Sequence, residues 1–87
     1  MKEDYRAALK KTLCTWMGIT RVSMNMTQEM MAEILLIDVR SYADIDRGIS
    51  LCGTLTFVLF LVYLCPEPAM LLNEIKINFE QIRNMME

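Results

Sequence analysis

The sequence predicts an all-α fold made of five helices in one small domain. Apolar residues recur every three or four positions over most of the 87 residues, which is the spacing of one helix face. Thr27 and Asp38 stand where helix N-caps are expected, and Gly48 and Pro66 stand where helices should end. The apolar fraction of 54% is sufficient for a core, and the length leaves room for a single domain over residues 1–87.

Residues 1–25 are expected to be mostly helical. An apolar stripe runs along them at spacings of four, four, three and one: Tyr5, Leu9, Leu13, Trp16 and Met17. Lys2, Arg6 and Lys10 fall on another side of this helix. Gly18 interrupts the stripe and costs about 1 kcal/mol relative to Ala inside a helix. It therefore marks either a kink or a junction between two pieces.

Residues 26–48 read as two short helices joined by a tight turn. Thr27 and Asp38 are suitable N-caps for the two helices, and Gly48 suits a helix stop. The apolar positions that recur at helical spacing behind the caps are Met31, Ala32, Leu35, Tyr42 and Ile45. Eight residues, a three-residue turn and about ten further residues have the size of a helix-turn-helix.

The same stretch resembles the helix-turn-helix of the phage repressor and Cro regulators, the XRE-like family. The residues that carry the resemblance are Thr27-Gln28-Glu29, Ala32-Glu33 and Asp46-Arg47-Gly48, at a spacing that matches without a gap. The resemblance implies a five-helix lambda-repressor-like domain with extended N-terminal and C-terminal helices. It places the helix-turn-helix unit at residues 27–47.

The resemblance also implies a site and a partner, which is double-stranded DNA. In this family the third helix enters the major groove and its first residues contact base edges. The residues implied for base readout are Val39, Arg40, Ser41, Ala43 and Asp44, and those implied for the DNA backbone are Gln28 and Arg47. Arg40 can pair bidentately with guanine, and Val39 can touch a thymine methyl group.

An ion pair between Arg21 and Asp46 follows from the same resemblance. Many family members place an Arg at the position of Arg21, and it pairs with the acidic residue two positions before the helix-ending Gly. We therefore expect Arg21 and Asp46 to tie the first helix to the third. The alternative is two independent surface charges.

Residues 49–65, ISLCGTLTFVLFLVYLC, form the most apolar stretch of the chain. Gly53 and Thr54 look like a helix start, which leaves about twelve residues, or about 18 Å, against a membrane core of about 30 Å. We therefore expect a buried helix rather than a membrane span. The resemblance assigns one stripe to the core, formed by Phe57, Val58, Leu61 and Leu64. A second apolar stripe, which family members usually make polar, consists of Leu55, Leu59 and Val62 and needs a cover.

Residues 68–86 are expected to form a fifth helix after Pro66 and Pro68. Its apolar residues are spaced three, four, three and four, as in a heptad seam: Leu72, Ile75, Phe79, Ile82 and Met86. Two arrangements would cover this seam and the second stripe of the fourth helix. Either the terminal helices pack there within one chain, or two copies of the chain meet. A two-fold homodimer, with residues 68–86 as its dimerisation element, is the preferred interpretation.

The composition argues against several other functions. There is no His, and the chain shows no nucleophile–base pair, Gly-rich phosphate loop or set of metal ligands. We therefore expect no enzyme activity, no metal or other cofactor and no small-molecule ligand. Cys14, Cys52 and Cys65 form no C-x-x-C pair and are expected to be free thiols in a reducing cytosol. The N-terminus lacks an apolar signal core, so the expected location is the cytoplasm, without a membrane partner.

Two functions remain open after these observations. The first is a sequence-specific, DNA-binding transcriptional regulator that acts as a homodimer. Leu36 replaces the usual turn Gly, however, Asp44 stands where many members have Arg, Gln or Lys, and residues 49–53 hold no Lys or Arg. The net charge of -2 is also not the basic excess of a strong DNA binder. The alternative is a protein-interaction module, antitoxin-like or adaptor, that retains the fold but has lost DNA affinity.

Overall fold

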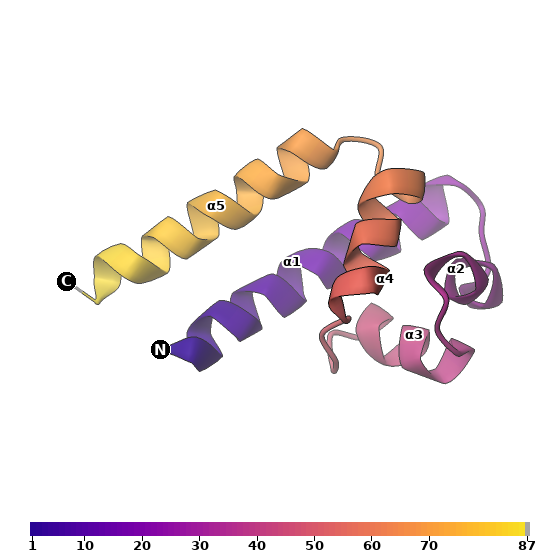
Figure 1. The fold of residues 1–87 in the computed structure, drawn as a ribbon, viewed down its shortest axis with the longest axis horizontal. Coiled ribbons are helices and arrows are strands. Elements are labelled where there is room, and N and C mark those ends of the chain that lie inside the picture. The colour runs from indigo at the N-terminus through magenta and orange to yellow at the C-terminus, as the bar shows by residue number, and fades with distance from the viewer. Residues whose placement is uncertain (87) are drawn as a thin grey trace.

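The computed structural model describes residues 1–86, and all regular structure in that range is helical (Figure 1). In chain order the elements are α1 (Lys2–Ser23), α2 (Gln28–Leu35), α3 (Val39–Asp46), α4 (Thr54–Leu59), the π-helical turn η1 (Phe60–Leu64) and α5 (Pro68–Met85). This confirms the predicted all-α fold. The long helices α1 and α5 run side by side in opposite directions, and α2, α3 and α4 gather at one end of the pair (Figure 1). The molecule measures 43 × 24 × 20 Å.

Helix α1 is continuous through Gly18, so the chain has no junction between two pieces at this position. A Cβ atom placed on Gly18 would lie 3.4 Å from Oδ1 of Asp46. That distance is an ordinary van der Waals contact, so Gly18 lies where the end of α3 packs on α1. Of the predicted apolar stripe, Leu13 and Met17 are buried. Leu9 and Trp16 are partly buried and pack against the core.

Side-chain caps begin both α2 and α3, as predicted. Oγ1 of Thr27 accepts a hydrogen bond from the backbone N–H of Met30 at 3.1 Å. Oδ1 of Asp38 accepts one from the backbone N–H of Ser41 at 2.6 Å. These bonds to the charged form lower the pKa of the Asp38 carboxyl group. Each cap satisfies a backbone donor that the helix itself leaves unpaired.

The turn between α2 and α3 places a leucine, Leu36, in a backbone conformation that favours glycine. Leu36 has φ +58° and ψ +41°, in the left-handed region that costs a residue with a side chain about 1–2 kcal/mol. The backbone N–H of Ile37 donates to the carbonyl of Ala32 at 3.1 Å and ends α2. Gly48 plays the corresponding part after α3, with φ +75°, and confirms the predicted helix stop. The turn thus tolerates the strain at Leu36.

The core lies where α1 meets the three short helices and the start of α5. The largest fully buried side chains are Met17, Met31, Leu35, Tyr42, Phe60 and Leu71. They come from α1, α2, α3, η1 and α5, so five of the six elements contribute to one core. This core fixes the position of α3, the helix on which the predicted site depends.

The fourth helix starts as predicted but ends and faces the core differently. Helix α4 begins after Gly53, and its last turn widens into η1, where the N–H of Cys65 donates to the carbonyl of Phe60 at 2.8 Å. Cys65 is extended because the following residue is Pro66, and the residue before proline disfavours the helical region. No helix in residues 1–86 combines the length and hydropathy that a membrane crossing requires.

The assignment of Val58 to the core and of Leu59 to the outer stripe was wrong. Thr56 and Phe60 face inward, and Oγ1 of Thr56 donates to the carbonyl of Leu35 at 3.3 Å. Val58 lies midway between them on the helix, so it points away and is 44% exposed. Leu59 is partly buried against the core. We call Leu55 and Val58 of α4, together with Val62 of η1, the outer face of α4.

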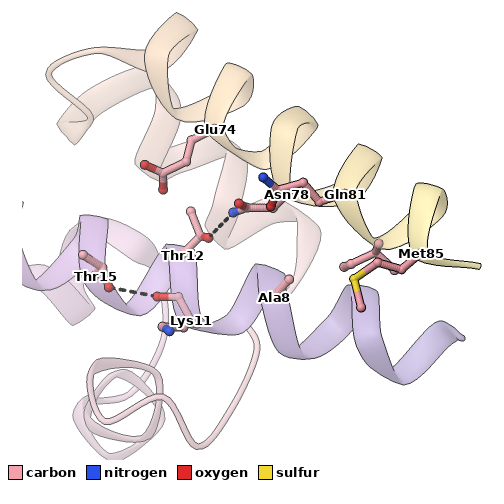
Figure 2. Close-up of a pocket in the computed structure, with 9 residues that line it drawn as sticks. Ala8, Lys11, Thr12, Thr15, Glu74, Asn78, Gln81 and Met85 are labelled. Atoms are coloured by element: carbon pink, nitrogen blue, oxygen red, sulfur yellow. Dashed lines mark hydrogen bonds between the residues drawn. The ribbon is translucent and has the colours of Figure 1, made fainter.

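Helix α5 packs on α1 and leaves the outer face of α4 uncovered. The rings of Tyr5 and Phe79 meet edge to face at 5.0 Å between centroids. Nδ2 of Asn78 donates to Oγ1 of Thr12 at 3.1 Å (Figure 2). Nε1 of Trp16 donates to Oε2 of Glu74 at 3.1 Å. Within the described part of the chain, the terminal helices therefore do not cover the outer face of α4, which was one of the two predicted arrangements.

The buried face of α5 differs in part from the apolar seam predicted from the sequence. Leu71, one position before the predicted Leu72, is the buried residue of this helix, whereas Leu72 and Met86 are exposed. The other three predicted seam residues, Ile75, Phe79 and Ile82, are partly buried within the chain. The face turned to α1 includes the polar Asn78, which a purely apolar pattern does not select. Ile75, Phe79 and Ile82 are therefore largely used inside the chain.

Candidate nucleic-acid interface

The start of α3 presents three consecutive exposed residues, Val39, Arg40 and Ser41. Asp38 caps the helix directly before them, so their backbone is fixed. Arg40 forms no ion pair within residues 1–86. The negative charge of Asp38 interacts with Arg40, but the guanidinium group is exposed and can meet an acceptor on another molecule.

Two further predicted readout positions differ in accessibility. Ala43 is only 8% exposed, so its assignment to base readout was wrong. Asp44 is half-exposed and lines a hollow with Ser41 and Ser50. The accessible part of the predicted readout set is thus Val39, Arg40 and Ser41, with Asp44 beside them.

The two residues assigned to the DNA backbone are also placed differently from each other. Arg47 is exposed at the end of α3, seven positions after Arg40 and hence on nearly the same side of the helix. Gln28 is half-buried, and its Nε2 donates to Oδ2 of Asp46 at 3.1 Å. Gln28 therefore has a structural role within the chain, whereas Arg47 is free to contact a phosphate group.

Asp46 is the centre of a polar cluster that joins α1, α2 and α3. Nη2 of Arg21 lies 3.6 Å from Oδ2 of Asp46, so the expected ion pair is formed. The hydroxyl of Tyr42 donates to Oδ1 at 3.5 Å, and Nε2 of Gln28 donates to Oδ2. Sγ of Cys14 donates to the backbone carbonyl of Asp46 at 3.0 Å. We call Arg21, Gln28, Tyr42 and Asp46 the Asp46 junction, and it holds the end of α3 against the other two helices.

Tyr42 connects this junction to the core, and its hydroxyl group should ionise at a higher pH than that of an exposed tyrosine. Burial of the hydroxyl group, and next the negative charge of Asp46, raise the pKa of Tyr42 to about 12. An unfolded tyrosine titrates near pH 10, so the folded state holds this proton more tightly than the unfolded state. The resulting stability is complete below about pH 10 and is lost as the pH rises through about 12.

A tyrosinate titration tests this expectation. One part of the absorbance increase from ionised tyrosine, that of Tyr42, should appear only near pH 12. Tyr42→Phe should remove this part of the increase. The variant should also show a weaker loss of stability between about pH 10 and 12 than the wild type does. A wild-type titration complete by pH 11 in the folded protein would contradict the buried position of the hydroxyl group.

A shallow hollow lies between α1 and the end of α3 and was not foreseen. Its lining includes Lys10, Lys11, Arg47 and Gly48. Nζ of Lys10 donates to the carbonyl of Ile49 at 3.5 Å. The sequence already placed Lys2, Arg6 and Lys10 on one side of the first helix, but only the packing of α1 on α3 brings that side to Arg47.

Other surface features offer less chemistry. A hollow between α1 and α5 (Figure 2) is lined partly by polar groups, and Asn78 and Glu74 there already bond to α1. In residues 1–86 no three His, Cys, Asp or Glu side chains lie together as metal ligands would. Cys14, Cys52 and Cys65 are free thiols. Burial raises the pKa of the Cys52 thiol, which keeps it in the unreactive protonated form.

Comparisons of the chain with models of protein families, with curated proteins and with solved structures found no match. The fold defines an all-α chain with two short capped helices, α2 and α3, joined by a three-residue turn. The candidate site is the exposed start of the second of these helices.

Proposed function

We propose that this protein is a DNA-binding transcriptional regulator that reads the major groove with α3 and acts as a homodimer. The observation that carries the proposal is Arg40, exposed and without an ion pair in residues 1–86, at the start of a capped helix. The resemblance of residues 26–48 to the repressor and Cro helix-turn-helix supports the same assignment. In that arrangement the first residues of the second helix of the unit contact base edges.

Each accessible side chain has a chemical part in this proposal. Arg40 donates two hydrogen bonds to O6 and N7 of guanine, and Val39 contacts the methyl group of thymine. Arg47 supplies a phosphate contact two turns further along α3. Asp44 disfavours acceptor groups beside it and favours the amino group of cytosine. The Asp46 junction keeps α3 at a fixed angle to α1 and α2, so these groups are positioned before DNA binds.

The homodimer is proposed from the outer face of α4. Leu55 and Val62 are 63% and 64% exposed, and with Val58 they form one apolar stripe at spacings of three and four. A second copy of the chain offers the same stripe, and a two-fold axis brings equal surfaces together. Such a dimer would present two α3 helices to half-sites about 34 Å apart.

The runner-up function is a protein-interaction module without DNA affinity. The apolar outer face of α4 and the pI of about 5.1 favour it, because both suit a protein partner better than a polyanion. The two functions differ in what Arg40 does. A regulator needs Arg40 for readout, whereas an interaction module that binds through α4 does not.

Replacement of Arg40 tests the proposed function. Duplexes that the wild-type protein selects from a random library serve as the probe. Arg40→Ala should weaken binding to them by about 1–3 kcal/mol and relax the preference at one base position. Lys76→Ala, which removes one positive charge from the exposed side of α5, is the control and should bind as the wild type does. Selection of no duplex, or equal binding by Arg40→Ala, would favour the interaction module.

A further inference from the structure

The N-terminal half of α1 carries a row of positive charges. Lys2, Arg6 and Lys10 are spaced by four residues, so they follow one another along one side of the helix over about 12 Å. Lys2 and Arg6 are exposed, and Lys10 is partly exposed. None of the three forms an ion pair within residues 1–86. We call these residues, together with Lys11 and Arg47, the basic row.

The basic row is continuous from α1 to α3. Lys10, Lys11 and Arg47 line the same hollow between the two helices. Gly48 sits at its base, where a Cβ atom would lie 3.6 Å from Sγ of Cys14. Gly48 is thus in contact distance of α1, next to the lysines that line the hollow with it. Arg40 extends the same line of charge, because it lies on nearly the same side of α3 as Arg47.

The charge distribution makes the row unusual for this chain. The net charge is -2, yet five of the nine Lys and Arg residues belong to the basic row. The helical neighbours of Lys10, three and four positions away, include Arg6 and no acidic residue. Like charges at a spacing of four destabilise a helix, so the row costs stability in the free protein. An anionic ligand that lies along it would offset this cost.

We propose that the basic row binds the phosphates of the DNA that flanks the bases read by α3. This inference rests on the proposed function and adds to it a surface on the N-terminal part of α1. Residues 49–53, after α3, offer no Lys or Arg for the phosphate backbone. The row supplies positive charge from the neighbouring helix instead. Each phosphate contact releases a condensed counterion and makes binding depend on salt.

A lipid surface is the other polyanion that such a row could meet. A helix that binds membranes needs an exposed apolar face beside its basic face. The apolar stripe beside the basic row is turned to the core and to α5, where Tyr5 packs on Phe79 and Leu9 packs against the core. The exposed apolar residues of α1, Ile19 and Val22, lie nine or more positions after Lys10, away from the row. The geometry therefore favours DNA.

The salt dependence of DNA binding tests the basic row. The probe is a labelled duplex of about 25 base pairs of random sequence, titrated by fluorescence anisotropy over a range of NaCl concentrations. Each lost phosphate contact makes the negative slope of log K against log salt less steep by about 0.9, so Lys2→Gln/Arg6→Gln/Lys10→Gln should reduce the steepness by about 2 to 3. Affinity at low salt should fall at least tenfold. Lys2→Arg/Lys10→Arg, which keeps the charges, should retain the wild-type slope.

Single substitutions provide a matched pair if the triple variant folds poorly. Lys10→Gln should make the slope of log K against log salt less steep by about 0.9, and Lys76→Gln on α5 should leave the slope unchanged. Equal slopes for Lys10→Gln, Lys76→Gln and the wild type would overturn the basic row and leave the proposed function standing. Absence of DNA binding by the wild type at low salt would overturn both. Binding to phosphatidylserine vesicles that requires the row, with an unchanged slope on DNA, would assign it to lipid and also overturn it.

Discussion

Replacing Leu71 with Ala is expected to lower the free energy of unfolding by about 3 kcal/mol, within the range of about 2–5 kcal/mol for buried leucines. Leu71 is 0% exposed and is the buried residue of α5, so its loss leaves a cavity where α5 joins the core. Leu72→Ala is the matched control. Leu72 is 49% exposed, and its replacement should change the monomer's stability by less than about 0.5 kcal/mol.

Urea unfolding followed by circular dichroism measures both variants, at a protein concentration where sedimentation shows only monomer. The comparison is sharp because the two substitutions remove the same atoms at adjacent positions of one helix. If Leu72→Ala costs as much as Leu71→Ala under these conditions, α5 packs through the seam predicted from the sequence, and its observed orientation is wrong. A cost that appears for Leu72 only at dimeric concentrations would place Leu72 in an interface.

Asp46→Ala should destabilise the fold by about 2–4 kcal/mol. The substitution leaves the guanidinium group of Arg21, the hydroxyl of Tyr42 and the amide of Gln28 without their shared acceptor. Removing one partner of a fully buried pair costs about 3–5 kcal/mol. The side chains of Arg21 and Asp46 remain 25% and 15% exposed, so water recovers part of that loss.

Asp44→Ala is the control for Asp46→Ala. Asp44→Ala removes the same charge two residues earlier on α3. The side chain of Asp44 makes no hydrogen bond or ion pair within the described residues. Its replacement should change the stability by less than about 0.5 kcal/mol. Thermal or urea unfolding measures both. A loss below about 1 kcal/mol for Asp46→Ala would show that the Asp46 junction does not hold the three helices together.

The features that could be predicted from the sequence are mostly local. The caps at Thr27 and Asp38 and the helix stop at Gly48 depend on hydrogen bonds to residues a few positions away. Such bonds form whatever the rest of the chain does, so residue type and spacing are enough to place them. The Arg21–Asp46 pair joins distant residues and was expected only through the resemblance to a known family.

The errors concern faces of helices that carry little contrast. Helix α4 is apolar on nearly all sides, so nothing in its sequence tells Val58 from Leu59, and the contact of Thr56 with Leu35 decides the matter. Helix α5 turns Asn78 toward Thr12, 66 residues earlier in the chain, and no apolar pattern can anticipate that pair. The orientation of these helices is thus set by distant partners.

The candidate site divides in the same way. Arg40 is exposed as expected because it follows a locally determined cap. Ala43 is only 8% exposed, which depends on how α3 packs in the folded chain. The basic row was visible as a spacing of four along the first helix, but its continuation to Arg47 depends on how α1 packs on α3.

We propose that this small protein binds DNA through α3 although its net charge is -2. The most direct measurement is the binding of the wild-type protein to a random duplex as a function of salt. DNA binding through α3 predicts a dissociation constant of about 1–100 μM or tighter at low salt. This dissociation constant should increase steadily as the salt concentration rises. A protein that is folded by circular dichroism and does not bind the duplex at low salt would contradict it.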